Sequence, residues 1–279
     1  MHQKLKKALG GILGILLLVL IYSFAPSRAI AHQLLSVFRV RKVAIIPLNV
    51  DTKELDQRLD TLTKELERIF PEPQVTVDAP IQKVDSLEEA KQLAGFPVRW
   101  PSYWPEPSPP HIQVEGRSEY TLPITGEDLA TLLELAGMRP KIPRELHGTI
   151  TVRIPAIVYL QGRRLTLWEV YNPSIEYPQE LNPQILGEAS LRLLGVPPSQ
   201  ARRIAKGIDW TSTFILPIPT QISRFDELEI AGAKAILLHA RNPGEASPLT
   251  LLWVKDDVLY FLSGPTSSNG IIQIAESLF

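Results

Sequence analysis

The sequence predicts an α+β protein preceded by one N-terminal transmembrane helix. Residues 8–24 are apolar and carry no charge. In the remainder, helical and strand-like segments are grouped instead of strictly alternating, which is typical of the α+β class. The last third contains short strands separated by turn residues and ends in an apolar helical stripe. We therefore expect short helices packed on antiparallel sheets, and a C-terminal β-meander closed by a helix.

The apolar run, ALGGILGILLLVLIYSF, predicts the membrane helix. As a helix it spans roughly 25 Å, the short end of what crosses a hydrocarbon core. Lysines at positions 4, 6 and 7 predict that residues 1–7 form a cytoplasmic tail. Four basic residues within 28–42 oppose this orientation, but the signal-like start favours it. We expect a single-pass protein of the cell membrane that contacts the lipid bilayer through residues 8–24, with its bulk extracytoplasmic.

The run is also compatible with a secretory signal cleaved after Ala31, because Ala29-Ile30-Ala31 is a small-residue site. The apolar core of such signals is usually about 7–15 residues, however, and this run is longer. We therefore favour a retained anchor. Residues 25–50 should then form a juxtamembrane helix over 32–38 and a strand over 40–46.

Composition limits the classes of function. A hydrophobic content of 44% with 21% charged residues indicates a globular chain. The net charge of −1 argues against a nucleic-acid partner, which would need a basic surface. The absence of cysteine excludes disulfides, thiolate metal sites and a cysteine nucleophile. The 25 prolines favour many short elements over long helices.

Residues 51–195 are predicted to form a first α+β region. Leucines at 55, 59, 62 and 66 with Ile69 mark one face of an amphipathic helix that ends before Pro71. This helix is too short for a coiled coil and should pack on its own domain. Ser86 and Glu89 form a capping box that opens a helix ending at Gly95. Further helices are predicted at 129–135 and 182–194, and strands at 112–114, 118–122, 150–154, 157–160 and 165–171.

Residues 196–279 are predicted to form the β-meander and its closing helix. A short helix at 198–206 comes first. Turn residues then separate five strands, at 211–216, 227–230, 233–239, 249–254 and 258–262. Asn269 is predicted to cap the final helix, whose apolar stripe is Ile271, Ile274, Ala275 and Leu278.

No pattern in the chain predicts catalytic chemistry. The five histidines lack the spacing of a helical zinc site, and no Gly-x-Ser-x-Gly motif occurs. His239 is interpreted as a satisfied or surface imidazole rather than a ligand. Asp256 and Asp257 lie between two strands and are interpreted as a hairpin turn rather than a carboxylate pair. We therefore predict no catalytic, cofactor-binding or metal-binding residues, no cofactor, and no enzymatic activity.

The most suggestive surface is the aromatic cluster of Trp100, Tyr103 and Trp104 among prolines. Stiff aromatic loops bind protein partners or lie on lipid headgroups. The other interpretation, which we favour, is that these rings cover an open face of a sheet, as large aromatic side chains commonly do. Replacing all three with serine separates the two interpretations.

Six segments of the chain are informative when taken together: residues 36–40, 86–97, 101–105, 207–213, 251–264 and 274–278. They resemble a family of uncharacterised bacterial extracytoplasmic domains. In some members this domain is the outer, C-terminal part of a membrane-anchored anti-sigma-factor-like protein. The resemblance covers about two-thirds of the chain and includes no catalytic motif.

One departure from that family matters. Anti-sigma proteins hold their sigma factor with a cytoplasmic domain, often built on a Cys/His zinc site, whereas only seven residues precede the apolar run here and cysteine is absent. We therefore expect a binding, sensing or regulatory domain that acts outside the cytoplasm on an unknown protein partner or ligand. The alternatives are a hydrolase secreted after cleavage at Ala31 and a structural envelope protein.

Overall fold

The computed structural model describes residues 36–37, 41–49, 52–77, 79–139, 142–210, 212–219, 223–240 and 248–279. The predicted tail, membrane helix and cleavage site lie outside these residues. Among the helices that are described, none combines the length and the apolar character needed to cross a bilayer.

The described residues form an α+β fold with mostly antiparallel sheets, as predicted. The helices are α2 (Thr52–Ile69), α3 (Leu87–Ala94), α4 (Gly126–Leu135), α5 (Pro183–Leu193), α6 (Pro198–Gly207) and α7 (Ser268–Glu276). The strands are β1 (Ser36–Val37), β2 (Lys42–Leu48), β3 (Gln74–Val77), β4 (Ile81–Val84), β5 (His111–Glu115), β6 (Ser118–Thr125), β7 (His147–Ile154), β8 (Ile157–Gln161), β9 (Thr166–Tyr171), β10 (Ser174–Tyr177), β11 (Thr213–Pro219), β12 (Ser223–Ile230), β13 (Ala233–Ala240), β14 (Leu249–Lys255) and β15 (Val258–Gly264).

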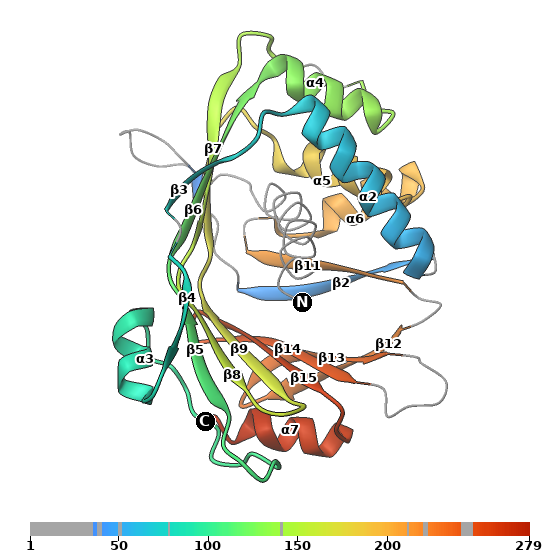
Figure 1. The fold of residues 1–279 in the computed structure, drawn as a ribbon. Coiled ribbons are helices and arrows are strands. Elements are labelled where there is room, and N and C mark those ends of the chain that lie inside the picture. Colours follow the sequence, from blue (N-terminus) through green and yellow to red (C-terminus); the bar gives the residue numbers. More distant parts are fainter. Residues whose placement is uncertain are drawn as a thin grey trace.

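Four pairs of consecutive strands connect the two large sheets: β3 with β4, β5 with β6, β7 with β8, and β9 with β10. Each supplies one strand to an upper sheet of order β1-β10-β7-β6-β3 and one to a lower sheet of order β12-β13-β14-β15-β9-β8-β5-β4. The links between the two halves are short, such as residues 116–117, 155–156 and 172–173. Figure 1 shows the resulting wall running from top to bottom of the molecule. Because β15 pairs with β9, strands from both predicted regions share the lower sheet.

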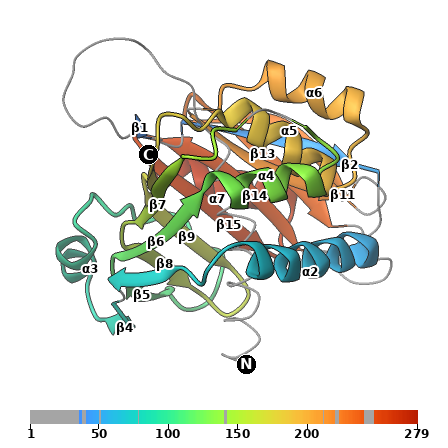
Figure 2. The same cartoon turned by 90° about the horizontal axis from the view of Figure 1, so that it is seen from above.

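The upper core lies between the upper sheet and a layer of helices. Helices α2, α4, α5 and α6 follow one another across this layer (Figure 2). Thr125 begins α4 with a capping box to Asp128, and Asn182 caps α5 ahead of Pro183. Trp210 is buried beside α5 and α6, and its indole N–H donates to the Ala205 carbonyl at 2.5 Å.

The lower core lies between one face of the eight-stranded sheet and the two helices α3 and α7. Alternate residues of the strands, such as Val158 and Leu262, belong to the same buried cluster as the apolar stripe of α7. Ile271, Ile274 and Ala275 of that stripe are fully buried, which confirms the predicted face of the closing helix. The rings of Trp253 and Tyr260 stack with their centroids 4.8 Å apart.

Three local predictions are wrong. Ser36 and Val37, expected in a helix, form β1 and pair with β10, because a sheet edge supplies backbone partners that local pattern cannot reveal. The strand predicted at 211–216 is outside the meander: it is β11, which runs parallel to β2 in a separate two-stranded sheet. Ser267, not Asn269, caps α7, since its side chain accepts the Gly270 N–H at 3.0 Å.

Candidate interaction site: the aromatic loop

The aromatic loop, defined as residues 96–106, connects α3 to β5. Gly95, with φ of 73°, ends α3 in the left-handed conformation that favours glycine and turns the chain into the loop. The side chains of Phe96 and Val98 are buried in the lower core. The loop then runs along the lower end of the molecule near the C-terminal residues (Figure 1). Its first half is therefore fixed by apolar packing.

The C-terminal end of α7 fixes the middle of the aromatic loop. The Ser102 amide donates to the Ser277 carbonyl at 3.1 Å, and the Tyr103 amide donates to the Ser277 hydroxyl at 3.2 Å. The Ser102 amide thereby gives a partner to the Ser277 carbonyl at the helix end, where intrahelical donors run out. The backbone on both sides of position 102 is held against a rigid element.

Glu106 fixes the far end of the loop to the turn between β8 and β9. Its carboxylate accepts the amides of Arg163 at 2.7 Å, Arg164 at 2.7 Å and Leu165 at 3.1 Å. The Trp104 indole N–H donates to the same carboxylate at 3.3 Å. Burial alone would raise the pKa of Glu106, but these donors stabilise the charged form and leave the pKa below its usual value.

The structure separates the three predicted aromatic residues. Trp104 is partly buried against the lower core, so its ring covers the sheet. Trp100 and Tyr103 are 37% and 36% exposed. Among the described residues, the other exposed aromatic side chains are Tyr171 and Phe279.

Those two rings also contact the loop. The Phe96 ring stacks on Tyr171 with a centroid separation of 5.6 Å. The Arg99 guanidinium lies 4.7 Å from the centroid of the Phe279 ring. The exposed aromatic side chains of the described chain thus gather at one loop. Exposed aromatic surface beside an arginine is the composition typical of the centre of a protein interface.

Arg99 connects this surface to the sheet beneath it. Its backbone amide donates to Glu169 Oε2 at 3.0 Å, and its guanidinium pairs with Asp256 Oδ2 at 3.0 Å. Lys255 Nζ lies 5.2 Å from the Phe279 ring centroid and donates to the Ala231 carbonyl at 2.9 Å. Two cations, Arg99 and Lys255, therefore lie at the Phe279 ring, and the Asp256 carboxylate pairs with one of them.

Glu169 is a fully buried carboxyl that sequence reasoning missed. It lies on the core-facing side of β9, directly across from Tyr260 on β15. Burial raises the pKa of Glu169 to about 8, although the Arg99 amide and charge oppose the shift. The sequence pattern could have predicted its burial. Alternate residues of a strand lie on one face, and Glu169 follows Leu165 and Leu167 at that spacing.

Two more buried polar atoms lie in the same cross-strand row. Glu169 Oε1, the Tyr260 hydroxyl and Trp253 Nε1 form no hydrogen bond of standard geometry within the described part of the protein. Burial is the main cause that raises the pKa of Tyr260, and the nearby Glu169 adds to it. Glu169 and Tyr260 are therefore both neutral at low pH, and ionising either of them in this buried row would cost free energy.

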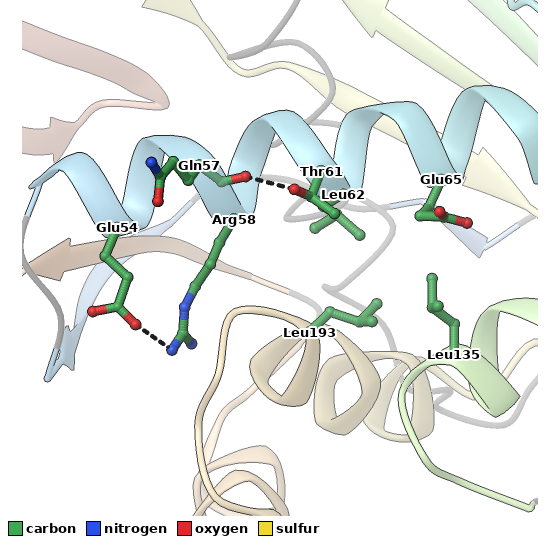
Figure 3. A pocket seen from close by; sticks show the side chains of 8 residues that line it. All are labelled: Glu54, Gln57, Arg58, Thr61, Leu62, Glu65, Leu135 and Leu193. Atoms are coloured by element: carbon green, nitrogen blue, oxygen red, sulfur yellow. Dashed lines mark hydrogen bonds and ion pairs between the residues drawn. The ribbon is translucent and has the colours of Figure 1, made fainter.

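A groove of about 260 Å³ lies between α2 and the ends of α4 and α5 (Figure 3). Leu62, Leu135 and Leu193 form its apolar part. Its main cation, Arg58, pairs with Glu54 at 2.6 Å and donates to the Leu194 carbonyl at 2.8 Å. Arg58 thus holds α2 to the end of α5, whereas Thr61 and Glu65 bond within α2 itself. The aromatic loop is therefore the stronger candidate site.

The remaining candidate groups lie apart from the aromatic loop or in turns. His239 Nε2 contacts Asp226 Oδ2 at 2.8 Å. Asp256 and Asp257 have φ of 51° and 61° and form the two-residue turn between β14 and β15, as predicted. Within the described ranges, no three His, Cys, Asp or Glu side chains are grouped so that they could hold a metal ion.

Comparison with protein-family models, with curated proteins and with solved structures gave no match to this chain.

Proposed function

We propose that this chain is a membrane-anchored extracytoplasmic binding module that docks a protein partner on its aromatic loop. The observation that carries the proposal is the loop itself, which is fixed at three places and exposes Trp100 and Tyr103. Residues 8–24 supply the anchor in this proposal, and the lysines before them supply its orientation.

Rigidity supports binding over a purely structural role for this loop. The buried Val98 fixes the chain before Trp100, Ser277 holds the amides of Ser102 and Tyr103, and Glu106 holds the loop beyond Tyr103. A surface already fixed in place loses little conformational freedom when a partner docks, so more of the contact energy appears as affinity. Trp, Tyr and Arg are also the residue types that most often dominate interface energetics.

The charges favour a protein partner over a lipid surface. Anionic headgroups attract clusters of Lys and Arg, each contributing about 1 kcal/mol near the membrane. Here Arg99 is paired with Asp256, and Lys255 is the other cation at the rings. A mixed, partly neutralised rim around aromatic side chains is the arrangement of a protein interface.

The test uses the full-length chain with Trp100→Ser and Tyr103→Ser together. Because both side chains are exposed, we expect the free energy of unfolding to change by less than about 1 kcal/mol. Co-purification of the partner from detergent-solubilised membranes should be lost. The matched control is Leu93→Ser with Leu135→Ser, two exposed apolar residues on other elements. Loss of stability with an unchanged set of partners would mean that the rings only cover the sheet.

A further inference from the structure

The outer side of α6 is basic. Three exposed basic residues share it: Arg202, Arg203 and Lys206. At about 100° of turn per residue, these three side chains lie within about 100° of the helix circumference. The buried Ala201 and Ala205 lie on the opposite side and pack in the upper core. The basic side chains therefore face away from the protein.

The start of β2 adds two more basic residues beside the end of α6. The amides of Arg41 and Lys42 donate to the Ser212 carbonyl at 2.8 Å and 3.0 Å. Lys42 Nζ lies 3.9 Å from Asp209 Oδ2, and Asp209 follows α6 closely in the chain. Arg41 and Lys42 are both exposed. We call the five basic residues of α6 and β2 the basic face: Arg41, Lys42, Arg202, Arg203 and Lys206.

Acidic side chains neutralise only part of the basic face. Glu188 pairs with Arg202 at 3.3 Å, and Asp209 lies at the longer distance from Lys42. The other three members of the basic face form no ion pair with any residue that the structure describes. Because the whole chain has a net charge of −1, this excess of positive charge is local and does not follow from composition. An exposed surface of this kind attracts anionic groups.

The position of the basic face in the chain indicates which anionic groups it meets. Only residues 25–40 separate the predicted anchor from Arg41. Even fully extended, a chain of that length spans at most about 60 Å. The basic face is therefore tethered close to the lipid headgroups of the membrane that holds the anchor. Tethering makes docking an intramolecular event, so a few charge contacts are sufficient to favour it.

We infer that the basic face docks on anionic lipid headgroups of the membrane that carries the anchor. Each Lys or Arg near such a surface contributes to the attraction, which fades within a Debye length and is screened by salt. Docking sets which side of the domain faces the bilayer. Both views place α6 and the aromatic loop at different ends of the molecule (Figures 1 and 2), so the docked domain leaves the loop available to a partner. The inference rests on the anchor of the proposed function and not on its protein partner.

The experiment measures the approach of α6 to lipid in the full-length chain. Because the chain has no cysteine, Ser199→Cys on the basic side of α6 gives a single site for a fluorescent donor. The labelled chain is reconstituted in vesicles that contain an acceptor-labelled lipid, and flotation first shows that the anchor is inserted. Energy transfer should be higher in mixed phosphatidylglycerol–phosphatidylcholine vesicles than in phosphatidylcholine alone, and should fall back at about 1 M salt. A donor at Leu93→Cys on α3, which is also exposed, should show no such rise.

Arg203→Gln with Lys206→Gln tests the basic face itself. Removing two of its charges should lower the ratio of docked to undocked domain on phosphatidylglycerol vesicles on the order of 30-fold. The matched control is Arg163→Gln with Arg164→Gln, which removes two exposed charges from the turn between β8 and β9. This control should dock as the wild type does. Equal losses in the two double variants would show a general effect of net charge and would overturn the inference.

The outcomes separate this inference from the proposed function. A chain that floats with the vesicles but shows equal energy transfer with and without phosphatidylglycerol overturns the inference alone. An equal rise at positions 199 and 93 overturns it too, because the domain would then approach lipid without a preferred face. A chain that does not float lacks the anchor, and both proposals are then wrong. Docking that persists in the Trp100 and Tyr103 serine variant, together with unchanged partner binding, supports the inference and contradicts only the aromatic loop.

Discussion

A single carboxylate, that of Glu106, joins the aromatic loop to the turn between β8 and β9. Three backbone amides and the Trp104 indole converge on it. The three amides lie in a tight turn, where the backbone supplies no acceptor for them. The conformation of the loop near Tyr103 thus depends on Glu106, although Glu106 is not one of the exposed aromatic residues.

Replacing Glu106 with Gln should destabilise the fold. The amide side chain can accept fewer of the converging N–H groups and has no charge to strengthen them, so we expect a loss of about 1–3 kcal/mol in urea unfolding at pH 7. Because the pKa of Glu106 is depressed, its contribution is present above about pH 4.5 and is lost as the pH falls through the folded value. The difference between variant and wild type should therefore shrink at pH 3.

Glu88→Gln is the control for this prediction, since Glu88 is highly exposed and its pairing with Lys91 is a surface i,i+3 contact. Its free energy of unfolding should stay within about 0.5 kcal/mol of wild type. Equal effects of the two substitutions would contradict the role given to Glu106.

At the scale of elements, the leucines on the two walls of the groove, one on α2 and one on α4, have opposite consequences for stability. Leu62 is buried in the upper core, whereas Leu135 of α4, on the other wall of the groove, is 42% exposed. Leu62→Ala should cost about 2–5 kcal/mol, because it leaves a cavity in a packed site. Leu135→Ala should cost less than about 0.5 kcal/mol.

Urea midpoints of the two variants, at unchanged m-values, measure the difference. A cost for Leu135→Ala as large as that for Leu62→Ala would show that the groove is closed by packing in solution. Such a result would mean that the groove is not open to solvent.

Elements with a local signal could be predicted from the sequence, and those held by distant partners could not. The capping box at Thr125–Asp128, the Asn182 cap and the 3.6-residue period of α2 all act within one helix. β1, β3, β4 and β10 are only two to four residues long, and their pairing is set by neighbours far along the chain. Likewise, Trp100 and Tyr103 could be selected by composition, whereas the bond from Arg99 to Glu169 spans 70 residues.

At the scale of the whole molecule, the bent strands make one continuous body from the two cores. β7 and β10 of the upper sheet are joined by short links to β8 and β9 of the lower sheet. The sheet that packs against the upper helices is therefore directly connected to the sheet next to the aromatic loop. An anchor before residue 36 would tether this entire body to the membrane. The proposed binding surface would then be held at a fixed location with a fixed orientation.

The proposed orientation predicts how the chain behaves on intact cells. Protease added outside should digest the residues beyond the anchor while cytoplasmic control proteins stay whole. The N-terminal peptide, identified by mass spectrometry, should begin before Ala31. Protection until the cells are lysed would refute the extracytoplasmic location, and a mature terminus at His32 would indicate a secreted protein.

The most direct test of the proposed interaction site is a photo-crosslinking amino acid placed at position 103 of the full-length chain in intact cells of the source organism. We predict one reproducible crosslinked protein, identified by mass spectrometry, whose yield falls at least tenfold when Trp100→Ser is added. The same probe at the exposed position 135 of α4 should not capture that protein. Crosslinking to lipid alone, or equal yields from positions 103 and 135, would contradict a protein-binding aromatic loop.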